Sequence, residues 1–178
     1  MTAWIALFRG VNVGGHNLLP MKGLAQALEK AGCVDVATYV QSGNVVLKYP
    51  GTQRERLTQL IQATVLERFE FSPKVLLLTL AEVQQAAKAN PYIDAETEPK
   101  SLHLYFLAKK PQTFDIDAFD KIRSESEHYA LIDQVFYLHA PDGFGRSKLA
   151  AKAESLLGVS ATARNWRTVT KLLELASS

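Results

Sequence analysis

The order of strand-like and helix-like segments constrains the fold of this chain more than any other feature. Residues 3–8 are apolar at consecutive positions, which is typical of a strand buried on both faces. Pro20 can begin a helix because the first turn does not need its missing N–H, and Gly32 can end it. Further strands are predicted at 36–41, 45–49 and 74–79, and a second helix at 53–69. The first 79 residues therefore predict a β-α-β-β-α-β unit.

The same order returns in the rest of the chain. A helix at 80–89 ends at the turn signal Asn90-Pro91, and the polar segment 94–100 is predicted to be a flexible connector. Strands are then predicted at 101–108, 128–132 and 135–139, helices at 115–123 and 145–157, and a weak strand at 159–164 before a C-terminal helix.

We therefore predict an α+β fold of two tandem ferredoxin-like (βαββαβ-type) units, residues 1–79 and 80–178. The second unit is expected to have a degenerate last strand and to carry the C-terminal helix. No residue-level repeat is visible, so duplication is inferred from element order alone.

Composition excludes several classes of protein. With 47% hydrophobic and 21% charged residues the chain is globular, and a net charge of +2 is far from the basic excess of nucleic-acid-binding proteins. Cys33 is the single cysteine, so no disulfide can form within the chain. The apolar runs are too short for a bilayer span, and the N-terminus lacks a signal-peptide pattern. A cytoplasmic location is predicted.

Three polar motifs stand out: residues 9–17 (RGVNVGGHN), residues 42–44 (SGN) and residues 164–169 (RNWRTV). Together they resemble a widespread, mostly bacterial family catalogued as domain of unknown function 1697, and residues 145–149 (GRSKL) are similar to a further pattern of that family. The resemblance runs over nearly the whole chain. It implies a two-part α+β fold and a cytosolic setting, with no agreed reaction, cofactor or substrate. His16 stands where many relatives carry a basic residue.

The first motif joins a strand to a helix, and such loops can aim backbone N–H groups at an anion. Its Gly-x-x-x-Gly-Gly spacing fits neither the Walker A nor the dinucleotide-binding pattern. The alternative is a glycine-permitted turn whose asparagines satisfy backbone groups. Arg9, at the end of a buried strand, needs a carboxylate, carbonyl groups or a bound anion as its partner.

The other two motifs also have structural interpretations. Residues 42–44 suit a hairpin turn, and the topology allows this turn and the loop after the first strand to lie at opposite ends of the sheet. Asn165 or Thr168 can cap the C-terminal helix, with Trp166 as its core anchor. Alternatively, Arg164 and Asn165 complete an anion-binding cleft with Arg9.

No reaction can be named from the sequence. The four histidines, at positions 16, 103, 128 and 139, show no metal-ligand spacing, and those within strands are expected to be structural. Cys33 has no neighbouring base that would make it a nucleophile. No metal site is predicted, and the cofactor stays unknown.

The leading hypothesis is that a small phosphate- or carboxylate-bearing ligand binds in a cleft between the two units, with an enzyme of unassigned reaction as an extension. One alternative is a non-catalytic protein-interaction module whose polar motifs are structural, and a weaker one is nucleic-acid binding. The sequence leaves the oligomeric state open. The candidate ligand-binding residues are Arg9, Asn12, Gly14, Gly15, Asn17, Ser42, Asn44, Lys148, Arg164 and Asn165.

Overall fold

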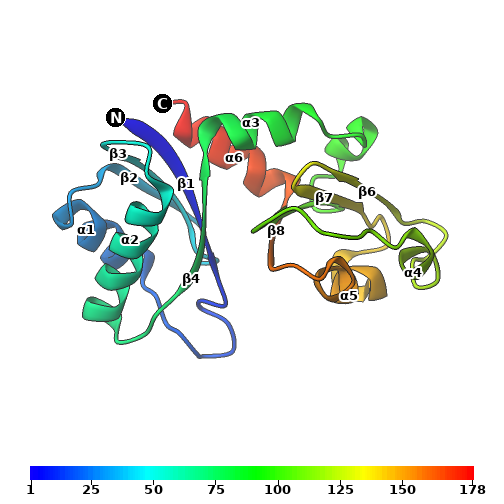
Figure 1. Cartoon of the computed structure of the whole chain (residues 1–178), viewed down its shortest axis with the longest axis horizontal. Coiled ribbons are helices and arrows are strands. Elements are labelled where there is room, and N and C mark those ends of the chain that lie inside the picture. The colour runs from blue at the N-terminus through cyan, green and yellow to red at the C-terminus, as the bar shows by residue number, and fades with distance from the viewer. The chain divides into compact units, whose positions relative to one another are not determined.

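The computed structural model describes residues 1–178 and contains two four-stranded antiparallel sheets and six α-helices (Figure 1). Contacts group the chain into two compact units, residues 1–85 with 171–178, and residues 86–170. The predicted division into domains at residue 79 stays a prediction.

The sheet of the first unit has the strand order β2-β3-β1-β4. Its central strand β1 pairs antiparallel with β3 and with β4, so that Ala6 lies between Val45 and Leu77. The elements are β1 (Thr2–Arg9), α1 (Met21–Lys30), β2 (Val34–Tyr39), β3 (Asn44–Tyr49), α2 (Arg54–Phe69) and β4 (Lys74–Thr79).

Helices α1 and α2 cover one face of this sheet (Figure 1). Their apolar stripes are fully buried, with Leu24 and Leu28 on α1 and Leu57 and Ile61 on α2. The side chains of residues 4–8 alternate between the two faces of the sheet, and all are at most 2% exposed. The prediction of a strand buried on both faces is therefore confirmed.

The second unit repeats this strand order, as β6-β7-β5-β8, and all its pairings are antiparallel. Its core packs Tyr105 and Leu107 of β5 against Phe119, Leu149 and Ala153 of the two helices. The elements are the 3-10 helix η1 (Ile93–Thr97), β5 (Leu102–Leu107), α4 (Ile116–Asp120), β6 (His128–Ile132), β7 (Val135–His139), the 3-10 turn η2 (Phe144–Arg146), α5 (Lys148–Leu157) and β8 (Ala161–Asn165).

Helices α3 (Leu80–Lys88) and α6 (Trp166–Ala176) complete the set of six, and each includes residues of both units. None of the helices combines the length and the apolar character needed to cross a membrane.

The expectation of a flexible connector at residues 94–100 was wrong. Residues 93–97 form η1, and Asn90 anchors the segment because its side-chain amide donates to Glu96 Oε1 at 2.8 Å. Asn90 Oδ1 also accepts the backbone N–H of Tyr92 at 3.0 Å. Polar composition was misleading here because two of its polar side chains make local hydrogen bonds, Glu96 with Asn90 and Thr97 with the carbonyl oxygen of Asp94.

The expectation of a degenerate last strand in the second unit was also wrong. β8 is a regular strand that pairs with β5 over five positions, from Leu107 opposite Ala161 to His103 opposite Asn165. Its alanine-rich sequence has low β propensity, so the strand depends on pairing with buried β5 rather than on its own residues.

Candidate functional site

Asn12 holds the loop after β1 in place. Its side-chain amide donates to the carbonyl oxygens of Leu19 at 2.9 Å and Gln41 at 2.7 Å, and its Oδ1 accepts the N–H of Leu19 at 2.7 Å. The residue has a φ of 55°, a left-handed conformation that asparagine tolerates. Both amide hydrogens are used by the backbone, so this side chain supports the loop.

The rest of the loop is a tight turn. The N–H of His16 donates to the carbonyl of Val13 at 3.1 Å across Gly14 and Gly15, which have φ values of 60° and 77° and are exposed. Asn17 closes the loop, because its side-chain amide donates to the carbonyl oxygen of Gly10 at 3.1 Å. These bonds favour the structural alternative for this motif.

The β2–β3 turn lies at the same end of the sheet as this loop, contrary to the opposite-end arrangement that the topology allowed. The N–H of Phe8 donates to the carbonyl of Gly43 at 2.8 Å, and Asn12 reaches Gln41 in the turn. The side-chain amide of buried Asn44 donates to Ser42 Oγ at 2.9 Å and to the carbonyl oxygen of Tyr39 at 3.1 Å. The cause is strand pairing: the end of β1 lies opposite the start of β3.

Arg164 and Asn165 lie at the end of β8. Arg164 Nη1 donates to the carbonyl of Ala163 at 2.8 Å, and burial lowers the pKa of its guanidinium to about 10. Asn165 Oδ1 accepts the N–H of Thr168 at 2.9 Å, which confirms Asn165 as a cap of α6. Arg9 is half-buried at the end of β1 in the first unit, so its meeting with these two residues in one cleft stays a prediction.

Lys148 lies elsewhere, at the start of α5, and borders a cavity within the second unit. The cavity has a volume of about 500 Å³. Its walls come from the segment after α4, the turn after β7 and the first turn of α5: Lys121, Ile122, Arg123, Ser124, Glu127, Asp142, Gly143, Arg146, Ser147 and Lys148. We call it the basic cavity, because four of these side chains are cationic.

The two carboxylates of the basic cavity are engaged by neutral donors. Asp142 accepts the hydroxyl of Ser126, and Glu127 Oε2 accepts the N–H of Ser124 at 2.9 Å. Arg123 is held by Asp120, with Nε to Oδ1 at 2.9 Å. By contrast, the cationic groups of Lys121, Arg146 and Lys148 are exposed and form no ion pair.

The start of α5 adds backbone donors to this cavity. Ser147 caps the helix by accepting the N–H of Ala150 at 2.8 Å, and no acidic residue lies in the first turn. This leaves the N–H groups of Lys148 and Leu149 as the first-turn donors without an acceptor in the helix, and the helix dipole places partial positive charge there. The backbone and three unpaired cations therefore favour an anion.

Sequence reasoning selected Lys148 but missed Lys121, Arg123 and Arg146 as partners in one cavity. Arg146 and Lys148 are two residues apart in the sequence, and a solvated surface explains such a small basic cluster as well as a binding site does. The available signal was the glycine-bounded stretch 143–148 (GFGRSK) before a helix, a context known for anion sites.

Two other candidate reactive groups are buried. Burial raises the pKa of the Cys33 thiol to about 11, so it is not a thiolate at neutral pH. Burial also lowers the pKa of His103 to about 4, and its ring stacks on Phe144 with centroids 3.6 Å apart. Neither group has the exposure expected of a nucleophile or base.

The chain belongs to the family described as "Protein of unknown function (DUF1697)", whose model matches residues 1–137. No curated protein matches it. A conserved bacterial protein from Streptococcus pneumoniae has a similar solved structure, with a TM-score of 0.76 over 98% of both chains at 19% sequence identity. That likeness shows the fold, and neither comparison indicates a reaction.

Proposed function

We propose that this protein binds a small phosphate- or carboxylate-bearing ligand, and that the basic cavity of the second unit is where the anion binds. The observation that carries the proposal is the convergence of four cationic side chains on one cavity of about 500 Å³. That volume lies within the range of small-molecule sites.

The balance of charges supports an anionic ligand. Three of the four cations have no carboxylate partner, whereas both carboxylates of the cavity already accept hydrogen bonds. The remaining cation, Arg123, is fixed by Asp120 and by the carbonyl oxygen of Glu127, which its Nη1 reaches at 3.0 Å. A guanidinium held in this way loses little side-chain entropy when it meets a phosphate.

We propose further that each unit is ferredoxin-like and that the chain is a tandem pair of βαββαβ units. The strand orders β2-β3-β1-β4 and β6-β7-β5-β8 support this, because each places the first and third strands of the unit at the centre. A cytoplasmic setting also remains our proposal, supported by the single, free and buried cysteine.

The rival function, an interaction module with structural polar motifs, is favoured in the first unit by the bonds of Asn12, Asn17 and Asn44. Anion binding by residues 9–17 would require Arg9, His16 or backbone donors, since the side-chain amides of Asn12 and Asn17 already serve the fold. The earlier hypothesis of a ligand between the two units stays a prediction.

Thermal unfolding in inorganic phosphate tests the proposal. At a phosphate concentration ten times its Kd, linkage stabilises the protein by about 1.4 kcal/mol. The double variant Arg146→Gln/Lys148→Gln is expected to lose this stabilisation while keeping the stability of the unliganded protein, because both side chains are exposed.

The matched control is Lys109→Gln/Lys110→Gln, which removes the same charge from exposed residues that do not line the cavity. It is expected to respond to phosphate like the wild type, with sodium chloride at equal ionic strength as the reference. Equal phosphate responses in the two double variants would reject the basic cavity as the site.

A further inference from the structure

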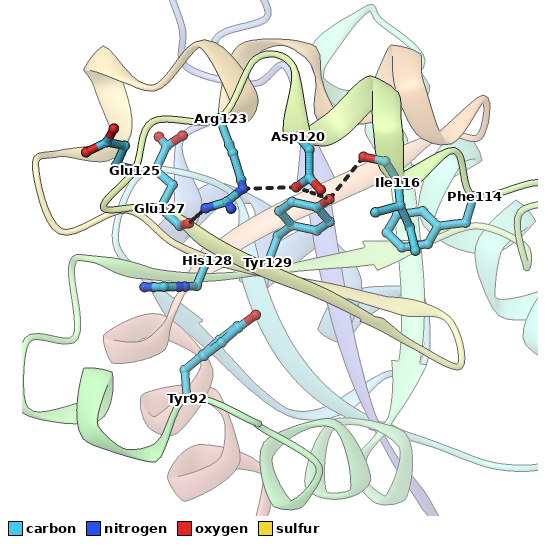
Figure 2. Close-up of a pocket in the computed structure, with 9 residues that line it drawn as sticks. All are labelled: Tyr92, Phe114, Ile116, Asp120, Arg123, Glu125, Glu127, His128 and Tyr129. Carbon is cyan, nitrogen blue, oxygen red and sulfur yellow. Dashed lines mark hydrogen bonds and ion pairs between the residues drawn. The ribbon is translucent and has the colours of Figure 1, made fainter.

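A second cavity of the same unit is lined by aromatic and polar side chains. It has a volume of about 490 Å³ and runs beside the edge strand β6 (Figure 2). Four of its side chains are rings, and the others are mostly polar. The lining residues are Tyr92, Phe114, Ile116, Asp120, Arg123, Glu125, Glu127, His128 and Tyr129. We call it the aromatic cavity.

The rings of this cavity are held in place before any ligand arrives. The Tyr129 hydroxyl donates to Asp120 Oδ1 at 2.8 Å and lies 3.2 Å from the carbonyl oxygen of Ile116 (Figure 2). The ring of Phe114 meets that of Tyr129 edge-on, with centroids 6.1 Å apart. On the other side of β6, Tyr92 and His128 have centroids 6.3 Å apart. Tyr92 and His128 lie on the face of β6 opposite to Tyr129, and we call these two rings the aromatic wall, against which a planar base can stack.

The aromatic and basic cavities meet, because Arg123 and Glu127 line both. Arg123 is fixed at this junction by Asp120 on one side and by the Glu127 carbonyl on the other. A single ligand with two chemically different ends can therefore be bound at the junction by one guanidinium, which two protein acceptors orient.

The two cavities differ in charge, and the difference orients such a ligand. The aromatic cavity carries three carboxylates, Asp120, Glu125 and Glu127, against one cation. The basic cavity carries four cations against two carboxylates. An anionic group is repelled by the first and attracted by the second, whereas amino donors on a ring find an acceptor in Glu125, the exposed carboxylate of the first that forms no hydrogen bond within the protein.

We propose that the ligand is a nucleoside monophosphate with an amino-bearing base, its phosphate in the basic cavity and its base in the aromatic cavity. This inference rests on the proposed function, because it places the same anion in the same cavity. Stacking on the aromatic wall adds affinity, and the Tyr92 hydroxyl, which makes no hydrogen bond within the protein, is available to the base.

Isothermal titration calorimetry of the full chain tests this with four probes: inorganic phosphate, adenosine, adenosine monophosphate and uridine monophosphate. Adenosine monophosphate is expected to bind at least about tenfold more tightly than phosphate or adenosine, the factor that one stacked base supplies. Uridine monophosphate, whose base has no exocyclic amino group, is expected to bind several-fold more weakly than the adenine nucleotide.

Variants of the two cavities separate the contributions. Tyr92→Leu is expected to weaken adenosine monophosphate about tenfold and to leave phosphate unchanged. His128→Ala, at an exposed position, provides a second test of the aromatic wall should Tyr92→Leu not fold. Arg146→Gln/Lys148→Gln is expected to weaken the nucleotide and phosphate while sparing adenosine.

The outcomes distinguish the two proposals. If phosphate binds in the basic cavity but the nucleotide binds no more tightly, the nucleotide inference is overturned and the proposed function stands. If adenosine binds, inorganic phosphate does not, and adenosine monophosphate binds no more tightly than adenosine, the proposed anion binding is rejected. The nucleotide inference is then rejected as well, because it rests on that function. Equal binding of the adenine and uracil nucleotides would overturn the assignment of an amino-bearing base.

Discussion

The two units share a strand order but use their polar loops differently. In the first unit, Asn12, Asn17 and Asn44 direct their amides at backbone carbonyls, so the loop after β1 and the β2–β3 turn lock each other in place. In the second unit, Arg146 and Lys148 flank a capped helix start and point their charges at no protein partner. Short amides serve local backbone geometry, whereas long cationic side chains without partners are available to a ligand.

The largest effect is expected where the two loops of the first unit touch. A Cβ at Gly43 would lie 2.6 Å from Phe8 Cβ and 2.7 Å from Val11 Cγ2, and the residue has a φ of +76°. Gly43→Ala is therefore expected to destabilise the protein by about 3 kcal/mol, measured by urea unfolding. Gly51→Ala is the control, since its φ is +88° but nothing lies within 4 Å. Its expected cost is about 1 kcal/mol, and equal losses would remove the case for loop contact.

Asn12 should matter more than Asn17 if the first loop is locked by amides. Asn12→Ala removes three side-chain hydrogen bonds and Asn17→Ala removes one, at similar φ values of 55° and 49°. We expect losses of about 2 and about 1 kcal/mol in unfolding free energy. Both variants are expected to bind phosphate like the wild type. Loss of phosphate binding in Asn12→Ala would instead indicate that the loop after β1 contributes to the ligand site.

The start of α5 provides the corresponding test in the second unit. Ser147→Ala removes the cap on the N–H of Ala150 and is expected to cost about 1 kcal/mol in denaturant unfolding. Ser155→Ala, within the same helix, removes only a bond to the carbonyl of Lys152 and is expected to change stability by less than about 0.5 kcal/mol. A Ser147 variant as stable as the Ser155 variant would mean that the loop, not the cap, positions α5.

The smallest effect is expected at the start of α3, where a carboxylate accepts the backbone N–H group, whereas the start of α5 is capped by a serine. Glu82 accepts the N–H of Thr79 at 2.7 Å and pairs with Arg54 at 2.7 Å. Burial pushes the pKa of Glu82 up, but the hydrogen bonds from Arg54 and Thr79 outweigh it and hold the pKa below its usual range. Its contribution to stability is therefore complete above the unfolded pKa of about 4.3 and is lost as pH falls through the folded value.

Glu82→Gln is expected to be less stable than the wild type by about 0.5 kcal/mol at pH 7, because the ion pair is partly exposed. Thermal unfolding across pH 3–7 measures this difference, which should shrink below about pH 4. A difference that stays constant down to pH 3 would contradict the role of the ionised carboxylate.

The periodicity of residues predicted most of the elements, because helix and strand patterns are local. The strands 128–132 and 135–139 have the predicted bounds, and Asp133 between them has the positive φ expected of a tight hairpin turn. Strand β8 and the helix η1 were misjudged because pairing with β5 and the bonds of Asn90 depend on residues outside each segment. The candidate site was predicted only through Lys148.

The sequence by itself determined the order of elements and the buried character of β1, and it narrowed the cap of the C-terminal helix to Asn165 or Thr168, each a matter of neighbouring residues. Only the tertiary structure showed which polar motif stabilises the fold through hydrogen bonds to the backbone. The end of β1 pairs with the start of β3, which brings Gln41 to the amide of Asn12. The tertiary structure also placed Lys121 and Arg123 beside the start of α5. The charge of a cavity depends on segments that lie far apart in the sequence, so local sequence patterns do not show it.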